Sequence, residues 1–198
     1  MPKIVTEQDK EEFRQRLCDA AEQLFAERGP EAVSMRQLAV ALNVSAMTPY
    51  RYFRDKDEIL AAVRTRGFER FFETMEAAYR SGDSGRAKGA SVRRAYLDFA
   101  LNNPNTYKLM FDLNQPTERD FPELDSASRR AKLSMTRWVQ DLIASGEITG
   151  DAEEIGEMYW AAVHGAVVLE LADKLPPGSA RRLQKFAART LLKGLQSA

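Results

Sequence analysis

Apolar residues recur every three or four positions along most of this chain, which is the period of an amphipathic α-helix. We therefore expect nine helices, over residues 11–27, 34–42, 46–53, 55–80, 87–102, 104–113, 122–145, 152–175 and 180–196. Alternation with period two, which is typical of a half-buried strand, is almost absent. The pattern predicts an all-α fold.

Short polar side chains mark several of the expected helix starts. Capping-box spacing is found at three places, which are Ser34 with Gln37, Asp55 with Glu58, and Asp151 with Glu154. Ser179 is predicted to cap the last helix, and Pro104 and Pro122 suit first helical positions. Breaks are expected at 29–30, 81–85 and 176–178, where glycine, proline and serine gather.

Residues 33–52 predict two short helices joined by a tight turn. Asn43 tolerates the left-handed conformation that ends a helix. The second helix lacks an apolar stripe and carries hydroxyl, phenol and guanidinium groups, which suit phosphates and base edges of DNA. Pro49 lies inside it, so either the helix starts there with Thr48 as its cap, or its first turn is irregular.

The run S-M-R-Q-L-A-x-x-L-x-V-S-x-x-T-x-Y-R-Y-F-x-x-K-x-x-I-L, which begins at Ser34, resembles the DNA-binding end of TetR/AcrR-family transcriptional regulators. The resemblance covers residues 10–62 and implies a DNA-binding domain over 10–70, with its helix-turn-helix motif at about 33–52. It implies DNA contacts by Ser34, Arg36, Ser45, Ala46, Met47, Thr48, Tyr50, Tyr52 and Lys56. Other interpretations stay open: Ser34 as a cap alone, Arg36 as a solvated cation, and Tyr50 or Met47 as packing residues.

The segments 95–111 and 160–165 resemble the C-terminal domain of a TetR subgroup called the WHG domain, which implies a helical ligand-binding and dimerisation domain over 71–198. Aromatic and sulfur side chains with a few polar tips suit an apolar pocket. The candidate lining is Tyr96, Phe99, Tyr107, Met110, Phe111, Met135, Trp138, Trp160 and His164. Aromatic residues at helical spacing are usually ordinary core, and a single histidine such as His164 is more often a hydrogen-bonded structural residue than a ligand-binding or pH-sensing one.

Composition excludes several classes of protein. The 198 residues carry 29 Lys and Arg against 29 Asp and Glu, so a basic face has to be assembled by folding. Cys18 is the only cysteine, which excludes a disulfide or a Cys-based zinc site within one chain, and we expect it in the core. With one histidine and no Glu-x-x-His pair, a di-metal bundle is not expected. Since no catalytic triad order or phosphate-binding glycine loop is evident, we expect no enzyme, metal or cofactor.

We expect a cytoplasmic protein with no membrane partner, because no signal peptide opens the chain and its longest apolar run, 158–169, is too short for a bilayer. The predicted function is a regulator, expected to be a repressor, that binds palindromic double-stranded operator DNA and is released by a small apolar effector. The resemblance implies a homodimer through the last two helices. The alternative is a helical ligand-binding or protein-interaction module without DNA binding.

Overall fold

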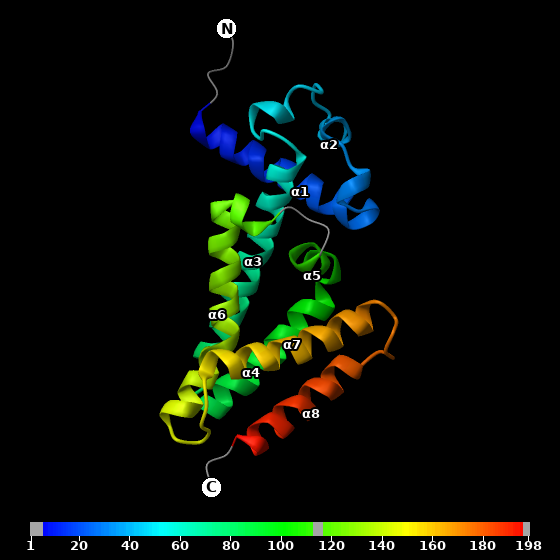
Figure 1. The fold of residues 1–198 in the computed structure, drawn as a ribbon. Helices are drawn as coiled ribbons and strands as arrows, with labels where there is room; N and C mark the ends of the chain where they lie inside the picture. The colour runs from blue at the N-terminus through cyan, green and yellow to red at the C-terminus, as the bar shows by residue number, and fades with distance from the viewer. Residues whose placement is uncertain (1–5, 113–116, 196–198) are drawn as a thin grey trace. The chain divides into compact units, whose positions relative to one another are not determined.

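The computed structural model describes residues 6–112 and 117–195, and all regular secondary structure in these ranges is helical (Figure 1). The eight α-helices are α1 (Glu7–Arg28), α2 (Met35–Ala41), α3 (Lys56–Arg80), α4 (Gly85–Asn102), α5 (Pro104–Phe111), α6 (Pro122–Ala144), α7 (Ala152–Leu171) and α8 (Ser179–Gly194). Three short 3₁₀ segments, η1 (Pro30–Ala32), η2 (Pro49–Arg51) and η3 (Glu118–Asp120), join them. The all-α prediction is confirmed, while the helix ends predicted at Leu113 and Gln196 lie outside the described residues.

The local capping chemistry gives most helix starts. The Ser34 hydroxyl accepts a bond from the Gln37 amide (3.3 Å), and the Gln37 side chain accepts one from the Ser34 amide (2.8 Å). The Asp55 carboxylate accepts a bond from the Glu58 amide (2.9 Å). At the start of α7, the same arrangement joins Asp151 and the amide of Glu154 at 2.8 Å. These predicted caps are confirmed, and Pro104 and Pro122 occupy first helical positions as expected.

Three expected features of the helices differ in the structure. The predicted helix 46–53 is a 3₁₀ turn over Pro49–Arg51, because proline supplies no amide for α-helical bonding. Ser179 does not cap α8, since Gly178 holds that position with a φ of 86° that favours glycine. The Glu58 carboxylate accepts a hydrogen bond from the Arg54 amide (2.6 Å), whereas the predicted capping box requires it to accept one from the Asp55 amide.

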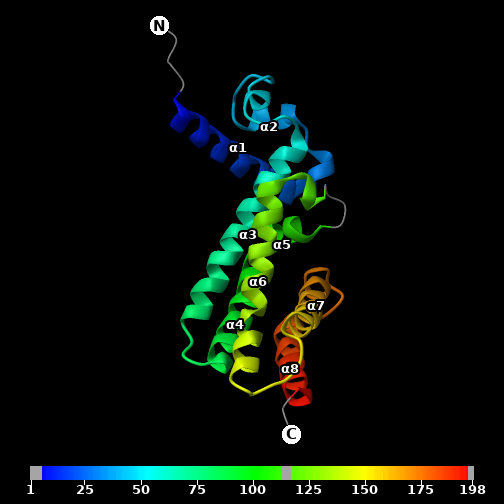
Figure 2. The ribbon, with the colours of Figure 1, turned by 60° about the vertical axis from the view of Figure 1, so that its left-hand side comes forward.

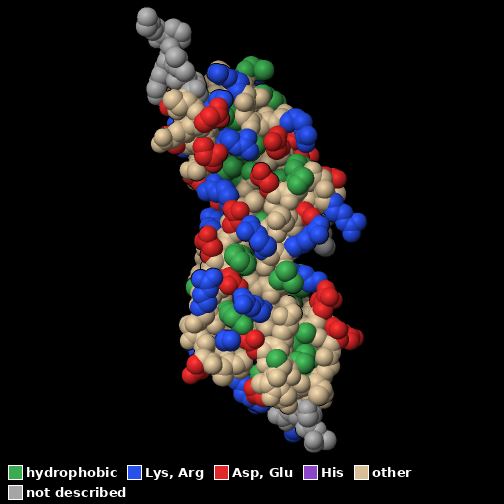
Figure 3. All heavy atoms as spheres, turned by 90° about the vertical axis from the view of Figure 1, so that its left-hand side faces the viewer, with side chains coloured by type: hydrophobic (Ala, Val, Ile, Leu, Met, Phe, Trp, Pro, Cys, Tyr) green, Lys and Arg blue, Asp and Glu red, His purple; other side chains and the backbone are tan. Residues whose placement is uncertain are grey.

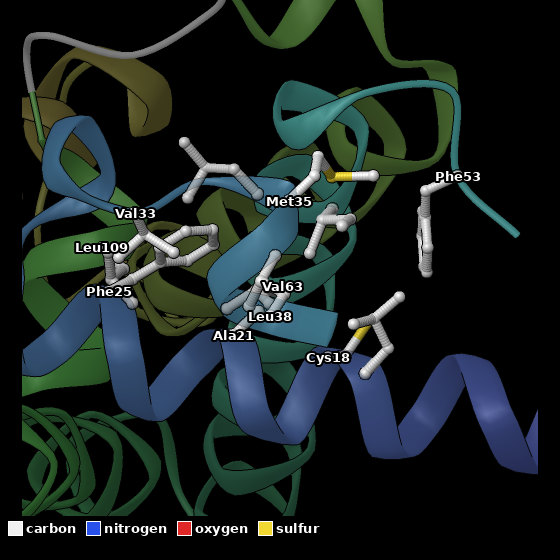
Figure 4. Close-up of a cluster of buried hydrophobic side chains, with 12 residues drawn as sticks. Cys18, Ala21, Phe25, Val33, Met35, Leu38, Phe53, Val63 and Leu109 are labelled. Atoms are coloured by element: carbon white, nitrogen blue, oxygen red, sulfur yellow. The ribbon is translucent and has the colours of Figure 1, made fainter. Parts of the chain in front are cut away.

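The described residues form two compact units. The first combines those of Met1–Phe68 with those of Asn105–Ala127, and the second combines Glu69–Pro104 with those of Ser128–Ala198. In the first unit, α1, α2, the start of α3 and α5 enclose one apolar cluster, which includes Phe25, Leu38, Phe53 and Leu109 (Figure 4). Cys18 lies in this cluster, 4% exposed, and burial raises the pKa of its thiol. The cluster therefore backs the helix-turn-helix segment.

The second unit packs aromatic rings between its helices. Phe71 makes edge-to-face contacts with Tyr96 and Phe99, at ring-centre distances of 5.6 and 5.1 Å. Trp138 of α6 meets Tyr159 of α7 in the same way at 5.6 Å. Helices α7 and α8 run side by side in Figures 1 and 2. Over the described ranges, no helix combines the length and the apolar character that crossing a membrane requires.

Candidate functional site

The turn that follows α2 brings the helix-turn-helix into shape. Asn43 adopts a positive φ of 54°, as expected for a residue that ends a helix in the left-handed region. The Val44 amide then donates to the carbonyl of Ala39 (3.0 Å), which folds the chain back against α2. The chain leaves this turn at Ser45, where the candidate recognition segment, residues 45–52, begins.

The recognition segment is a pair of tight turns without an α-helix. The Thr48 amide donates to the Ser45 carbonyl (2.9 Å), and the Arg51 amide donates to the Thr48 carbonyl (3.1 Å). Thr48 has helical backbone angles and makes no side-chain cap. Its hydroxyl lies 2.8 Å from the hydroxyl of Ser45. The sequence leaves two geometries open at Pro49. The observed 3₁₀ segment begins at Pro49 with Thr48 in the N-cap position, as in the first of them, but the Thr48 side chain makes no cap bond and no α-helix forms.

Most of the candidate DNA-contacting side chains lie on the surface. Met47 and Tyr50 are 68% and 50% exposed, so neither fills the core. The exposed set comprises Ser34, Arg36, Ser45, Ala46, Met47 and Tyr50, and the half-buried set comprises Thr48, Tyr52 and Lys56. Val40 of α2, 71% exposed, belongs to the same motif and was not singled out by the sequence analysis. An exposed valine on a predicted amphipathic helix gives no sequence signal of its own.

Helix α1 holds the far end of the recognition segment. The Arg14 guanidinium donates to the carbonyl of Tyr52 and lies 4.0 Å from the centre of the Phe53 ring. The Tyr52 ring stacks on Phe13, with ring centres 4.3 Å apart. The sequence analysis missed Arg14 and Phe13 as positioning residues, because their partners lie almost forty positions further along the chain.

The cations around the motif are not equally available to a ligand. The Lys56 ammonium donates to the carbonyl of Pro30 (2.8 Å), and Arg54 pairs with Asp55 (2.8 Å). Arg36 and Arg51 are exposed and have no acidic partner within residues 6–112 and 117–195. Figure 3 draws one face, on which Lys and Arg side chains are interspersed with Asp and Glu. Arg36 and Arg51 are therefore the cations of the motif best placed to meet a phosphate.

A small apolar cavity lies in the second unit, between α4, α6 and α7. Four candidate pocket residues line it, namely Tyr96, Met135, Trp138 and Trp160. Its volume of about 20 Å³ exceeds the roughly 10–15 Å³ that one water molecule needs, but it is far below the roughly 300 Å³ of a drug-sized site. The cavity as it stands does not accommodate a small organic effector.

The other candidate pocket residues lie elsewhere. Phe99 belongs to the aromatic core of the second unit, in contact with Phe71. Tyr107, Met110 and Phe111 belong to the first unit, where Phe111 meets the ring of Tyr107 at 4.9 Å. His164 lies one turn from Trp160, with ring centres 6.0 Å apart, and desolvation lowers its pKa below the ordinary value.

Two polar residues at the cavity, Arg93 and Tyr159, are not among the pocket residues predicted from the sequence. The Arg93 guanidinium lies 5.0 Å from the Trp138 ring centre, and burial lowers its pKa. The Tyr159 hydroxyl is buried and has no hydrogen-bond partner in the part of the chain that the structure describes, and burial raises its pKa. A guanidinium and a phenol among aromatic rings could orient a polar ligand group. Within the described residues, no three His, Cys, Asp or Glu side chains are grouped as a metal site.

Comparison with known proteins assigns both parts of the chain to one family. Residues 17–63 match "Bacterial regulatory proteins, tetR family", and residues 89–192 match "Tetracyclin repressor-like, C-terminal domain". The HTH-type transcriptional activator FasR of Mycolicibacterium smegmatis is 28% identical over 135 residues, which cover 68% of this chain. The matched region spans 60% of that relative's length.

Solved structures share the fold over nearly the whole chain. A Rhodococcus sp. RHA1 protein of unknown function is 28% identical, with a TM-score of 0.80 over 93% of this chain and 95% of its own. The transcriptional regulator FadR from Bacillus subtilis, solved in complex with stearoyl-CoA, has a TM-score of 0.76 at 19% identity, over 92% of this chain and 99% of its own. Since the C-terminal family match alone covers more than half of the 198 residues, the chain belongs to the TetR family of bacterial regulatory proteins.

Proposed function

We propose that this protein is a transcriptional regulator that binds double-stranded operator DNA through the recognition segment. The observation that carries the proposal is a run of exposed hydroxyl, phenol and guanidinium side chains held over a fully packed core. Such groups bond phosphates and base edges, whereas a purely structural turn has no need of them. The proposal includes that the protein is no enzyme and works in the cytoplasm, where bacterial operators are found.

Selection of bound sequences from random duplexes tests this function with the purified full-length protein. We expect a palindrome whose half-sites lie one helical turn apart, about 34–36 Å, or a multiple of it. No enrichment, together with no retention on nonspecific DNA at low salt, would favour the alternative of a ligand-binding or protein-interaction module.

Lys56 is proposed to contact a backbone phosphate from the start of α3, where the helix N-terminus adds to the attraction for anions. Replacing Lys56 with alanine should weaken binding to all sequences alike and reduce the salt slope of log K by about one. Lys174→Ala is the matched control, because Lys174 is an exposed lysine of the second unit. Filter binding at several salt concentrations measures the slope. An unchanged slope for Lys56→Ala would assign this lysine to the bond with Pro30 alone.

Homodimerisation is proposed through the last two helices. Four large apolar side chains on these two helices are between 42% and 57% exposed, namely Met158, Val168 and Leu169 of α7 and Phe186 of α8. Single exposed apolar residues are common on a monomer, but such a group is typical of an interaction surface. A two-fold dimer also supplies the two reading heads that a palindrome needs.

Phe186→Glu should convert the dimer to a monomer and weaken operator binding by at least about tenfold, because a charge buried at an apolar interface costs several kcal/mol. Leu133→Glu is the matched control, since Leu133 is 64% exposed on α6, outside the proposed interface. Light scattering coupled to size exclusion measures the mass. A dimer that survives Phe186→Glu but not Leu133→Glu would move the interface to α6.

Regulation by a small effector is proposed for the second unit. Support comes from the structurally similar FadR, which was solved in complex with stearoyl-CoA, and from the family match of the C-terminal part. The effector must bind one conformation better than the other, because equal affinity shifts no equilibrium. Repression stays a prediction, as the FasR relative is named an activator. Transcription in vitro from a promoter that carries the selected operator distinguishes the two signs.

A further inference from the structure

The second unit has a groove between α4 and α8. Its volume is about 490 Å³, which lies within the range of small-molecule sites. Five of its ten lining residues are cationic, and none is acidic. The cations are Arg93, Arg94, Arg181, Lys185 and Arg189. A chain with zero formal charge thus concentrates positive charge in one place.

Four of these five cations have no acidic partner within the described ranges. Arg181 pairs with Asp98 at 2.7 Å, whereas Arg93, Arg94, Lys185 and Arg189 form no ion pair there. Like charges in one groove repel each other, and a bound anion would convert that repulsion into attraction. Surface cations of a purely solvating face are usually interleaved with acids, as on the face drawn in Figure 3. The groove therefore has the electrostatics of an anion site.

The groove also has an apolar floor and a fixed polar residue. The apolar lining residues are Ala90, Leu97, Ala188 and Leu192, of which Leu97 and Ala188 are buried and form the floor. Gln184, only 7% exposed, donates to the carbonyl of Arg93 (2.7 Å) and so ties α8 to α4 at the middle of the groove. Charged walls over an apolar floor match a molecule that has both an acidic group and a hydrocarbon part.

Arg93 connects this groove with the small cavity, because it lines both. Its guanidinium now lies against the Trp138 ring, at 5.0 Å from the ring centre. An anion in the groove would compete with that ring for Arg93 and would so disturb the packing of Trp138 on Tyr159. Binding of an anion in the groove would therefore alter the packing between α6 and α7.

We propose that the α4–α8 groove binds the effector, and that the effector is an acidic amphiphile carrying a carboxylate or phosphate on a hydrocarbon chain. This inference rests on the proposed function and replaces the apolar effector expected from the sequence. The Arg and Lys side chains bind the acidic group, and the alanine and leucine floor receives the hydrocarbon.

Calorimetric titration of the full-length protein tests the ligand class with one ten-carbon chain and three head groups, as decanol, decanoate and decyl phosphate. We expect each acid to bind at least tenfold more tightly than decanol. The ratio between decanoate and decyl phosphate identifies carboxylate or phosphate as the preferred head group. Equal binding of all three compounds would overturn the proposal.

Substitutions locate the site. The double variant Arg94→Glu with Lys185→Glu should weaken binding of the preferred acid at least tenfold, since both residues line the groove and are exposed. Arg182→Glu is the matched control, because Arg182 is exposed on α8 outside the lining, and it should change affinity less than twofold. Unaltered affinity in the double variant would overturn the assignment.

Operator binding without ligand separates this inference from the proposed function. A groove that binds acids in a protein that ignores all DNA would leave the inference standing and reject the regulator. Normal operator binding that no acid changes would reject the inference and retain the regulator. The same conclusion would follow if the double variant bound the operator more weakly in the absence of any acid.

Discussion

Replacing Phe53 with alanine is expected to lower the free energy of unfolding by about 3–5 kcal/mol, the usual range for a large aromatic core residue. Phe53 is 2% exposed and follows the recognition segment directly. Its ring packs in the core cluster of the first unit (Figure 4). The guanidinium of Arg14 lies over the ring, 4.0 Å from its centre. A cavity at this point removes the support of the segment, so DNA binding should fall for all sequences alike.

Tyr50→Ala should have the opposite profile. Tyr50 is half exposed, so its loss should change stability by no more than about 0.5 kcal/mol. Operator affinity should nevertheless fall, because a phenol that bonds phosphate is lost. Urea denaturation and fluorescence anisotropy on the selected operator measure the two quantities. A Tyr50 variant that loses stability but keeps its affinity would contradict the proposed surface.

Gly156→Ala is expected to destabilise the second unit by about 1–3 kcal/mol through overpacking. An added Cβ would lie 2.6 Å from the Cβ of Thr136, which is closer than real Cβ contacts allow. Both groups belong to helices, α7 and α6, so relief requires the helices to shift. Denaturation of the variant measures the loss. The double variant with Thr136→Gly, which removes the clashing Cβ, should recover the part of the loss that comes from overpacking, apart from the roughly 1 kcal/mol that a glycine costs inside a helix.

Gly165→Ala is the control on the same helix. Among residues 6–112 and 117–195, nothing outside the adjoining helix backbone lies within 4 Å of a Cβ at Gly165, so alanine should stabilise the helix by up to about 1 kcal/mol. The two glycines of α7 thus separate close packing from helix propensity. If both substitutions changed the free energy of unfolding by the same amount, helix propensity alone would explain the result. That outcome would contradict the tight contact between Gly156 and Thr136.

The sequence predicted the features that depend on a few neighbouring residues. The Ser34 and Asp151 caps and the left-handed Asn43 follow from short-range hydrogen bonding and sterics. The same local reasoning failed at Ser179, where the flexibility of Gly178 outweighed the serine. At Pro49 the sequence left two geometries open, and the observed 3₁₀ segment begins at Pro49 without a side-chain cap from Thr48.

Features that depend on distant partners could not be derived in this way. Periodicity shows that Tyr96 and Tyr107 are buried on helices, but it cannot show that they belong to different units. Arg93 carries no sequence signal, because its importance arises only where α4 meets α8.

The single turn at Pro49–Arg51 has a consequence for the operator. A 3₁₀ segment rises about 2.0 Å per residue, so three residues span about 6 Å, less than two base-pair steps of about 3.4 Å. Where this turn enters the major groove, each subunit of the proposed dimer would contact only two or three base pairs directly through it. Specificity for the operator would then depend mainly on the distance between the two half-sites. Lengthening that distance by half a helical turn should lower the affinity more than changing any single base pair.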